Sequence, residues 1–291
     1  MNSFLQIRNL SVSLSNGQRV LRSINMELKK GEVRGLVGES GAGKSMIGKA
    51  ILGILPRALK IDAGEIIFQG KNLLNLKSNE FRKIIGANAA LIPQDPLTAL
   101  NPSHRIGPQI TNRLVDILGW KKSDAIIKTY DLLDEVQIAD PERVVNSFPH
   151  ELSGGMRQRI LIASAFAATP KLIIADEPTT ALDVTVQKQI LKLIKEMQIR
   201  HGTTLLFVTH DLGVVSKICQ SLSVLYSGKV IEDTSVSSFF NMPQHEYSKA
   251  LLVATPKYTD PKSDLIPVSE EVLTSVNGEI ARADKEWVNG R

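Results

Sequence analysis

The feature that most constrains the fold is a glycine-rich loop between an apolar run and a helical pattern. The loop fits the phosphate-binding pattern G-x-x-x-x-G-K-[ST] and reads Gly38-Glu39-Ser40-Gly41-Ala42-Gly43-Lys44-Ser45. The apolar residues 33–37 before it predict a buried strand, and residues 46–53 after it have helical spacing. Because strand, loop and helix follow in this order, the chain is constrained to an α/β fold with a nucleotide site.

The residue types of this loop suit phosphate binding. Glycines allow the backbone to turn tightly, so that several N–H groups point into one concavity. Lys44 would place a positive charge on the β- and γ-phosphates, and the Ser45 hydroxyl can bind Mg²⁺. The next helix would present its N-terminus to the phosphates. A chance glycine-rich turn is the weaker alternative, because it explains neither Lys44-Ser45 nor the strand before the loop.

Two carboxylates follow a second apolar run. Residues 172–175 predict a buried strand, and Asp176 and Glu177 stand at its C-terminal end. In open α/β sheets, ligands bind at that end of the strands. We therefore expect Asp176 to organise a Mg²⁺ shell and Glu177 to polarise the attacking water as a general base. Without the phosphate loop, an ordinary strand ending in a solvated acidic turn would be the better interpretation.

Two further strand ends carry polar side chains suited to the same chemistry. Residues 205–208 are apolar and lead to His210, which can reach the γ-phosphate and the attacking water. The strand predicted over residues 89–92 leads to Gln94, whose amide can bind Mg²⁺ or orient water. A single histidine at a strand end is usually structural, but here the neighbouring strand is expected to carry the carboxylate pair.

The periodicity along the chain predicts a mixed architecture. Residues 4–37 alternate apolar and polar positions with turn signals, which indicates an antiparallel β region. From 153 to 240, helices and apolar strands alternate, which favours a mostly parallel sheet with helices on both faces. Helical patterns between these regions indicate an inserted helical part, at residues 106–119, 123–135 and 141–146. The end of the chain, with Pro256, Pro261 and Pro267, predicts a tail of marginal structure.

The composition is that of an ordinary soluble globular protein, with 43 % hydrophobic and 22 % charged residues among 291. The formal net charge of +5 is a weak hint of an anionic partner, so no nucleic acid is expected. Cys219 is the only cysteine, which rules out an internal disulfide and fits a reducing compartment. We expect no membrane-spanning run and no secretory signal.

These motifs together resemble the ATP-binding subunits of ABC transporters, over residues 4–256. The most specific motif is similar to the signature loop of that family and reads Leu152-Ser153-Gly154-Gly155-Met156-Arg157-Gln158-Arg159. The resemblance implies that Ser153 and the backbone N–H groups of Gly154 and Gly155 bind the γ-phosphate held by the opposite subunit. Gln94 and His210 are similar to the Q-loop glutamine and the switch histidine. The stretch Thr180-Ala181-Leu182-Asp183 resembles the D-loop, which crosses the dimer interface beside Glu177.

The resemblance also implies the fold class and the ligands. The fold would be α/β, of the P-loop NTPase class, with a RecA-like core, an N-terminal antiparallel β-subdomain and an α-helical subdomain inserted at about residues 95–160. The ABC ATPase domain would span residues 4–256, and residues 257–291 would form a marginally structured C-terminal extension. ATP and Mg²⁺ are the implied ligands. Two such domains would close head-to-tail on two ATP molecules, because ATP contacts both subunits only in the closed state.

Longer stretches are similar to a narrower subclass, the importers of dipeptides, oligopeptides and nickel. They cover residues 94–102, 147–159 and 243–252, the last with Glu246 in place of a proline. Met156 and residues 178–180 resemble the D-type ATPase of dipeptide permeases. The implied complex contains a second, non-identical ABC ATPase subunit, two transmembrane permease subunits and an extracytoplasmic solute-binding protein. The chain would be a peripheral protein on the cytoplasmic face of the inner cell membrane.

The chain departs from the family pattern at two places. Family members stack adenine on an aromatic residue of the first hairpin, but no aromatic lies between Phe4 and Phe68, and Leu14 and Val20 stand nearest to that place. Because stacking contributes roughly 1–3 kcal/mol per base, we expect weaker or less base-selective nucleotide binding. Some relatives hold an iron–sulfur cluster on C-terminal cysteines. This tail has no cysteine, so we expect no cluster.

Three classes of function are compatible with a nucleotide site of this kind. An importer ATPase that powers peptide uptake fits best, although nickel or another small solute stays open as the cargo. A soluble, non-transport ABC ATPase would carry a coiled-coil insertion or a duplicated cassette, and neither is present. A module that binds nucleotide without hydrolysis would not need Glu177, Gln94 and His210, which are all in place.

Overall fold

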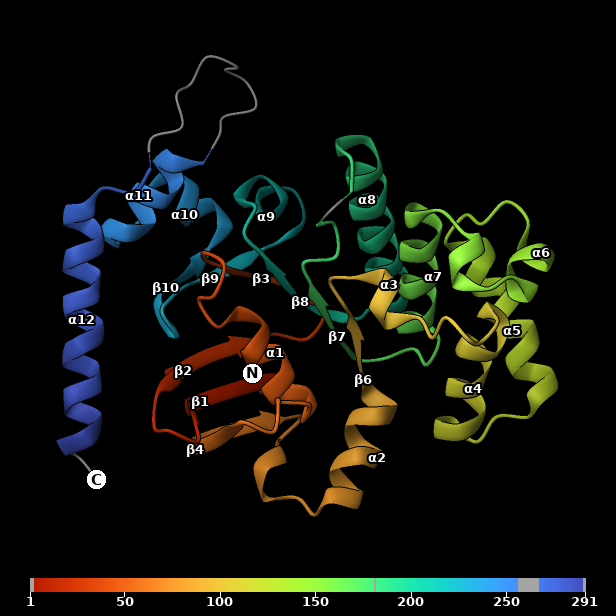
Figure 1. The fold of residues 1–291 in the computed structure, drawn as a ribbon, viewed down its shortest axis with the longest axis horizontal. Helices are drawn as coiled ribbons and strands as arrows, with labels where there is room; N and C mark the ends of the chain where they lie inside the picture. Colours follow the sequence, from red (N-terminus) through yellow and green to blue (C-terminus); the bar gives the residue numbers. More distant parts are fainter. Residues whose placement is uncertain (1–2, 181, 256–266, 290–291) are drawn as a thin grey trace. The chain divides into compact units, whose positions relative to one another are not determined.

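A computed structural model describes residues 3–180, 182–255 and 267–289, and its contacts divide the chain into two compact units (Figure 1). The first unit comprises Met1–Lys29, Val33–Leu74 and Val208–Arg291, and the second comprises Lys30–Glu32 and Asn75–Phe207. Ala181 of the predicted D-loop lies outside the described residues, as do residues 256–266 and 290–291 at the predicted C-terminal tail, which include Pro256 and Pro261.

The first unit contains the expected antiparallel sheet. Its strands lie in the order β2-β1-β4-β5, formed by Arg19–Leu28, Leu5–Leu14, Leu59–Phe68 and Lys71–Asn72. The central strand β1 pairs antiparallel with both neighbours, so that Leu5 lies opposite Leu28 and Phe68. Burial alternates in β2 from Ile24 to Leu28, as its apolar and polar alternation predicts. In β1 it alternates only at the start of the strand, and residues 10–13 are all buried, Ser11 and Ser13 included. Residues 4–37 therefore form the strands expected from the sequence.

A second group of strands in the first unit holds the loop at residues 38–45, here called the phosphate loop. Strand β3 (Val33–Val37) pairs parallel with β9 (Ser221–Tyr226), and β10 (Lys229–Ser235) pairs antiparallel with β9. The phosphate loop joins β3 to helix α1 (Lys44–Leu52). Cys219 follows helix α9 (Leu212–Ile218) and is buried. Its Sγ packs against Gly35 of β3, since a Cβ on Gly35 would lie only 3.3 Å from it.

The second unit combines parallel strands with the predicted helices. Strands β8 (Thr204–Thr209), β7 (Leu172–Asp176) and β6 (Ala89–Ile92) lie in that order, and β6 pairs parallel with β7. The predicted helices form as α4 (Ile106–Leu118), α5 (Lys122–Glu135), α6 (Pro141–Asn146), α7 (Gly154–Phe166) and α8 (Val184–His201). Two further helices, α2 (Ser78–Asn88) and α3 (Pro96–Ala99), were not expected.

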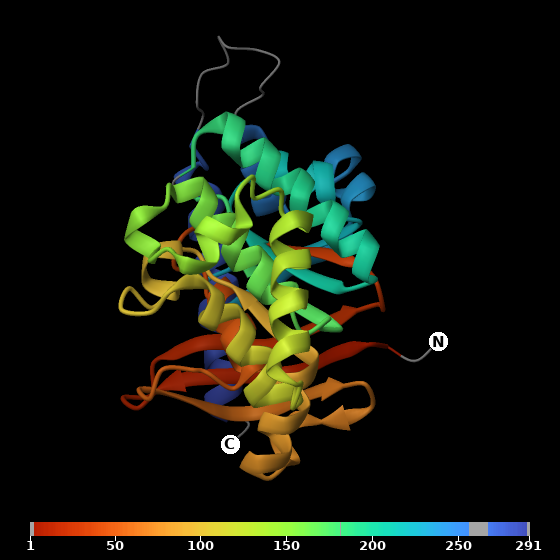
Figure 2. The ribbon, with the colours of Figure 1, turned by 90° about the vertical axis from the view of Figure 1, so that its right-hand side faces the viewer.

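Helices α4 to α7 pack on one another within the second unit (Figure 2). Their apolar faces supply a core that includes Ile110, Leu114 and Leu132, all with no exposed surface. The hydroxyls of Thr111 and Thr129 lie 3.0 Å apart between α4 and α5, and each also donates to a carbonyl oxygen of its own helix. The same unit includes β6, β7 and most of β8. The contacts therefore group these helices with the strands and do not set them apart as a separate helical unit.

The C-terminal segment differs from the expected marginal structure. Residues 246–254 form helix α11 and residues 270–289 form helix α12, with α10 (Val236–Asn241) before them. Helix α12 buries Val276 and Ile280, and its Asp284 pairs with Arg19 and Arg22 of β2. The prediction was wrong for residues 270–289, because contacts with a strand more than 250 positions away stabilise the helix. Among the described residues, no helix has the length and apolar character needed to cross a membrane.

Candidate nucleotide-binding site

The phosphate loop of the first unit begins at a fully buried strand and ends at a helix. All five residues of β3 are buried, whereas Glu39, Ser40 and Gly41 are exposed. Gly38 has a φ of 157°, and a Cβ at this position would lie 2.1 Å from the carbonyl oxygen of Leu225. Only glycine fits such a close approach of two backbone segments. The close contact of Gly38 with Leu225 of β9 therefore fixes where the loop begins.

Lys44 lies folded back over the phosphate loop. Its side chain is buried, and its Nζ donates hydrogen bonds to the carbonyl oxygens of Gly38 at 2.8 Å and Glu39 at 2.9 Å. The ammonium group is thus held at the centre of the loop, next to the N-terminus of α1. Helix α1 has no acidic residue in its first turn, so its positive end remains available to an anion. This arrangement fits the phosphate groups of a nucleotide.

The second unit carries the predicted carboxylates at the end of β7. Asp176 closes the buried strand and is 9 % exposed, and Glu177 follows with a φ of 47°. This left-handed backbone is rare for a residue with a side chain and costs on the order of 1 kcal/mol. It turns the Glu177 carboxylate toward two donors: the Gln94 amide nitrogen lies 3.2 Å and the Thr180 hydroxyl 3.0 Å from Oε2. Two of the predicted catalytic residues, Gln94 and Glu177, are therefore in contact.

The residues predicted to bind Mg²⁺ are oxygen ligands from three segments. They are the Ser45 hydroxyl, the Asp176 carboxylate and the Gln94 side-chain carbonyl. Among the described residues, no group of three or more His, Cys, Asp and Glu side chains could hold a metal by itself. Ser45 belongs to the first unit, whereas Asp176 and Gln94 belong to the second. Each offers an oxygen of the kind that Mg²⁺ prefers, and Mg²⁺ is usually held by one or two protein groups together with phosphates and water.

The signature loop opens helix α7 in the second unit. Ser153 is the N-cap, and its hydroxyl accepts a hydrogen bond from the Met156 N–H at 3.3 Å. Ser153 and Gly154 are exposed, and a Cβ on Gly154 would meet nothing within 4 Å. Gly155 lies closer to its surroundings, since its Cβ would be 3.5 Å from Val186. The helix N-terminus is therefore open to an anion from outside the chain.

Two predicted residues stand at the starts of other helices. Asp183 is the exposed N-cap of α8 and accepts from the N–H groups of Thr185 and Val186 at 3.0 and 2.9 Å. His210 is exposed and follows β8 in the first unit, one residue before the N-cap of α9. The phosphate loop and His210 thus belong to the first unit, and the carboxylates, Gln94 and the signature loop belong to the second.

Sequence reasoning missed two residues beside the site. Thr180 was part of a recognised loop, but its hydrogen bond to Glu177 depends on the left-handed backbone at Glu177, which no pattern predicts. Tyr247 of α11 is fully buried on Tyr226, with ring centroids 4.7 Å apart. Burial, and then the carboxylate of Glu39 in the phosphate loop, raises the pKa of Tyr247. Residues 243–252 resemble a stretch of the importer subclass, but that resemblance does not predict that Tyr247 lies beside the phosphate loop.

Comparisons with known proteins agree with these motifs. A family profile described as ABC transporter matches residues 21–180. A probable peptide ABC transporter ATP-binding protein, y4tR of Sinorhizobium fredii, is 44 % identical over 277 residues, which cover 94 % of this chain and 82 % of that protein. The oligopeptide transport ATP-binding protein OppD of Bacillus subtilis is 43 % identical over 278 residues, with 94 % and 76 % covered. The dipeptide transport ATP-binding protein DppD of Escherichia coli is 41 % identical over 266 residues, with 90 % and 81 % covered.

Solved structures give the same result for the fold. The structure of cbiO1 from Clostridium perfringens, part of the ABC transporter complex cbiONQ, has a TM-score of 0.73 and 28 % identity, covering 83 % of this chain and 92 % of that one. A dimeric structure of the ATP-binding cassette MJ0796, bound to ADP and Pi, has a TM-score of 0.70 and 26 % identity, covering 80 % and 98 %. The likeness therefore extends over most of this chain and most of each neighbour.

Proposed function

Because the chain belongs to the ABC transporter family, we propose that it is the ATP-hydrolysing subunit of an importer that powers peptide uptake. The contact of Glu177 with Gln94 and Thr180 carries the hydrolytic part of this proposal, because it presents a carboxylate at a strand end with fixed orientation. The buried Lys44 in the phosphate loop supports nucleotide binding. Relatives named for peptide, oligopeptide and dipeptide transport support the choice of cargo.

Each residue has a distinct role in the proposed reaction. The backbone N–H groups of residues 38–45 and the Lys44 ammonium hold the β- and γ-phosphates of ATP. Mg²⁺, held by Ser45, Asp176 and Gln94, would offset the charge of the phosphate oxygens. Glu177 accepts the proton of the attacking water at a carboxylate oxygen, and the Gln94 amide keeps that carboxylate in place. His210 orients the water and the γ-phosphate.

The remaining predicted residues serve a second nucleotide. Ser153, Gly154, Gly155 and Asp183 lie at exposed helix starts, so they can meet the ATP held by another subunit. We propose that this subunit is a second, non-identical ABC ATPase, and that two permease subunits and an extracytoplasmic solute-binding protein complete the importer. The chain would then act at the cytoplasmic face of the inner cell membrane as a peripheral protein. Closure of the two ATPases on ATP would transmit force to the permeases.

The substitution Glu177→Gln tests this proposal. It keeps the hydrogen-bonding shape but removes the base, so ATP hydrolysis by the complex that copurifies with the tagged chain should fall about 100-fold or more. ATP affinity of the isolated chain should stay within a factor of about three, because Glu177 lies outside the phosphate loop. Cells that produce only the variant should lose uptake of a labelled dipeptide.

The matched control for this test is Glu196→Gln, which makes the same chemical change at an exposed position of α8. It should leave both hydrolysis and uptake unchanged. The hydrolytic role is refuted if Glu177→Gln hydrolyses ATP as fast as this control. The peptide cargo is refuted if dipeptide uptake persists in Glu177→Gln cells while their hydrolysis is lost.

A further inference from the structure

Helix α12 is connected to the phosphate loop by a continuous chain of polar contacts within the first unit. We propose that Asp284 of α12 is a positioning residue for the ATPase, which acts through Arg22 and the turn at Ser227 and Gly228 to hold the phosphate loop in its nucleotide-binding shape. This inference rests on the proposed binding of ATP at residues 38–45. It gives the C-terminal helix a part in the nucleotide chemistry that no motif of the sequence indicates.

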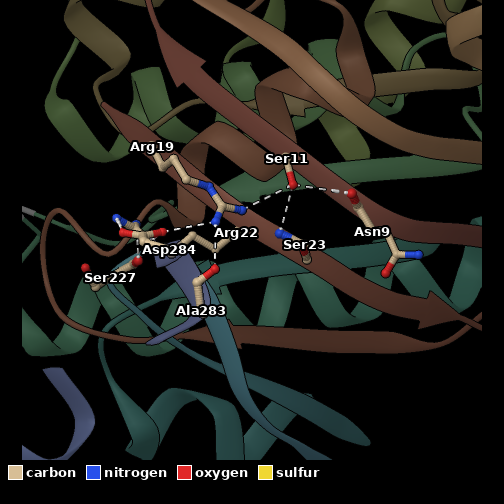
Figure 3. Close-up of polar contacts among 8 residues, drawn as sticks. All are labelled: Asn9, Ser11, Arg19, Arg22, Ser23, Ser227, Ala283 and Asp284. Carbon is tan, nitrogen blue, oxygen red and sulfur yellow. Dashed lines mark hydrogen bonds and ion pairs between the residues drawn. The ribbon is translucent and has the colours of Figure 1, made fainter. Parts of the chain in front are cut away.

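The first link is the pairing of Asp284 with two arginines of β2 (Figure 3). Arg22 binds it through two parallel hydrogen bonds, from Nε to Oδ1 at 2.8 Å and from Nη2 to Oδ2 at 2.9 Å. Arg19 adds a third, from Nη1 to Oδ1 at 3.0 Å. The arginine side chains are only 8 and 12 % exposed, so two nearly buried cations share the Asp284 carboxylate.

The second link connects Arg22 to the turn between β9 and β10. The Arg22 Nη1 donates to the carbonyl oxygen of Ser227 at 2.6 Å, and the Arg22 backbone N–H donates to the carbonyl oxygen of Gly228 at 2.7 Å. Gly228 has a φ of 74°, and a Cβ there would lie 2.0 Å from the carbonyl oxygen of Val20. The turn therefore sits against β2 with no room to shift toward it.

The third link reaches the phosphate loop itself. The Gly228 N–H donates to the carbonyl oxygen of Ala42 at 2.8 Å. Three residues before Gly228, the Leu225 carbonyl oxygen lies against Gly38, where a Cβ would be 2.1 Å away. The end of β9 and its turn thus touch the loop at two places, its first residue Gly38 and Ala42. A displacement of this turn must change the spacing of the backbone N–H groups that cradle the phosphates.

Helix α12 makes a parallel contact with the same strand end. The Tyr226 hydroxyl lies 3.0 Å from Oδ1 of Asn277, and the Tyr226 ring packs on Tyr247. Near Asp284, however, cavities of about 510 and 530 Å³ border Arg19, Arg22 and Trp287. Apolar packing is therefore sparse at this end of the helix. The charge pairing, together with the Arg19 guanidinium 4.5 Å from the Trp287 ring centre, holds this end of the helix, whereas Val276 and Ile280 are buried nearer its start.

The first test compares nucleotide affinity in Asp284→Asn and in Glu286→Gln. Glu286 is an exposed acid two positions further along α12, so both substitutions remove one negative charge from the same turn. Asp284→Asn should weaken ADP binding by the isolated chain about fivefold to twentyfold, and kcat of the copurified complex should change less than twofold. Glu286→Gln should leave both unchanged. If Asp284→Asn binds ADP as tightly as Glu286→Gln, the inference is overturned.

A double-mutant cycle locates the path of the effect. If Asp284 acts through Arg22, the combination of Asp284→Asn with Arg22→Gln should weaken ADP binding no more than Arg22→Gln does alone. Additive losses would show that Asp284 acts elsewhere and would overturn the proposed route. Asp284→Glu keeps the carboxylate and should recover most of the affinity, which a general loss of helix packing would not predict.

A second measurement needs no destabilising change at the contact. Trp120 and Trp287 are the two tryptophans, so Trp120→Phe leaves Trp287 as the sole indole emitter. The Trp287 ring lies 4.5 Å from the Arg19 guanidinium, which shares Asp284 with Arg22. If α12 and the phosphate loop are coupled through these residues, ADP should shift the Trp287 emission. Unchanged emission at saturating ADP would overturn the inference even if Asp284→Asn failed to fold.

Lys44→Ala distinguishes the inference from the proposal on which it rests. In the Trp120→Phe background, Lys44→Ala should abolish both ADP binding and the emission change. ADP binding that survives Lys44→Ala would refute the proposed nucleotide site. ADP binding that is lost on Lys44→Ala, together with an emission that never responds, would refute only the role of α12.

Discussion

Glu177 shows what a single position adds to a motif. The sequence pattern predicts its identity and its place after a buried strand, and Asp176 is confirmed at the end of β7. The backbone of Glu177 is left-handed, and two side chains hold its carboxylate. Neither property could be predicted, because a local pattern gives residue types in order, whereas the dihedral angle and the Thr180 contact follow from how the chain turns in three dimensions.

Gly154 offers a test at the same scale, because its Cβ would enter open space. Gly154→Ala should leave the melting temperature unchanged or raise stability by up to about 1 kcal/mol, since alanine suits a helix better than glycine. ATP hydrolysis by the copurified complex should nevertheless fall at least about tenfold, because the methyl group would cover the amides proposed to meet the second ATP. Calorimetry and a phosphate-release assay give the two values.

Gly107→Ala serves as the opposite control for this prediction. Its Cβ would lie 3.1 Å from the Val145 carbonyl oxygen, so stability should fall by about 1–3 kcal/mol. Wild-type hydrolysis by Gly154→Ala would exclude the proposed role of the signature loop.

The elements differ in how far the sequence predicts them. Helices α4 and α5 follow from apolar spacing, and their bounds lie within one residue of the expected 106–119 and 123–135. Strand β10 was missed because its sequence KVIEDTS carries little apolar alternation. Helix α12 was missed although its apolar residues have helical spacing, because the prolines before it favoured a tail of marginal structure. Its contacts with Arg19 and Arg22 of a distant strand could not be predicted from local periodicity.

Helix α11 depends on one carboxylate, and this dependence predicts a pH effect. Both carboxylate oxygens of Glu232 in β10 accept backbone hydrogen bonds at 3.0 Å, from Gln244 and His245 before the helix. Burial opposes the charge, but the hydrogen bonds outweigh it and lower the pKa of Glu232. A lowered pKa adds stability above the unfolded value, near 4.5, and this stability is lost as the pH falls through the folded value.

Glu232→Gln should therefore reduce the free energy of unfolding by about 1–3 kcal/mol at neutral pH and should flatten its decline below about pH 4.5. Urea unfolding at several pH values measures both effects. Glu27→Gln, on the exposed face of β2, should retain the wild-type pH profile. A Glu232→Gln curve parallel to the wild-type curve throughout the acid range would contradict the assignment.

The two motifs proposed to bind ATP phosphates lie in different units of the molecule. The phosphate loop lies in one unit and the signature loop in the other, and the latter is open to a ligand from outside the chain. The family resemblance predicted the α/β fold class, and the structural neighbours confirm it. The partner ATPase stays a prediction, because the residues of one chain encode its own surface and not the identity of the protein that meets it.

The isolated Glu177→Gln chain should remain a monomer near 31.9 kDa in ATP and Mg²⁺, since the proposed partner is a different cassette. Sedimentation equilibrium measures this mass directly. An ATP-dependent species of about twice that mass would show that two copies of this chain close on ATP together, and it would contradict the non-identical partner.

The burial of Cys219 behind β3 has a practical consequence for labelling. The only thiol of the chain is shielded by the protein interior, so thiol-directed probes should leave the folded protein unmodified. A cysteine introduced at an exposed position of α12, such as Lys285, would then react alone. A spin label or fluorophore could be placed on the C-terminal helix of the natural sequence without first removing a native thiol.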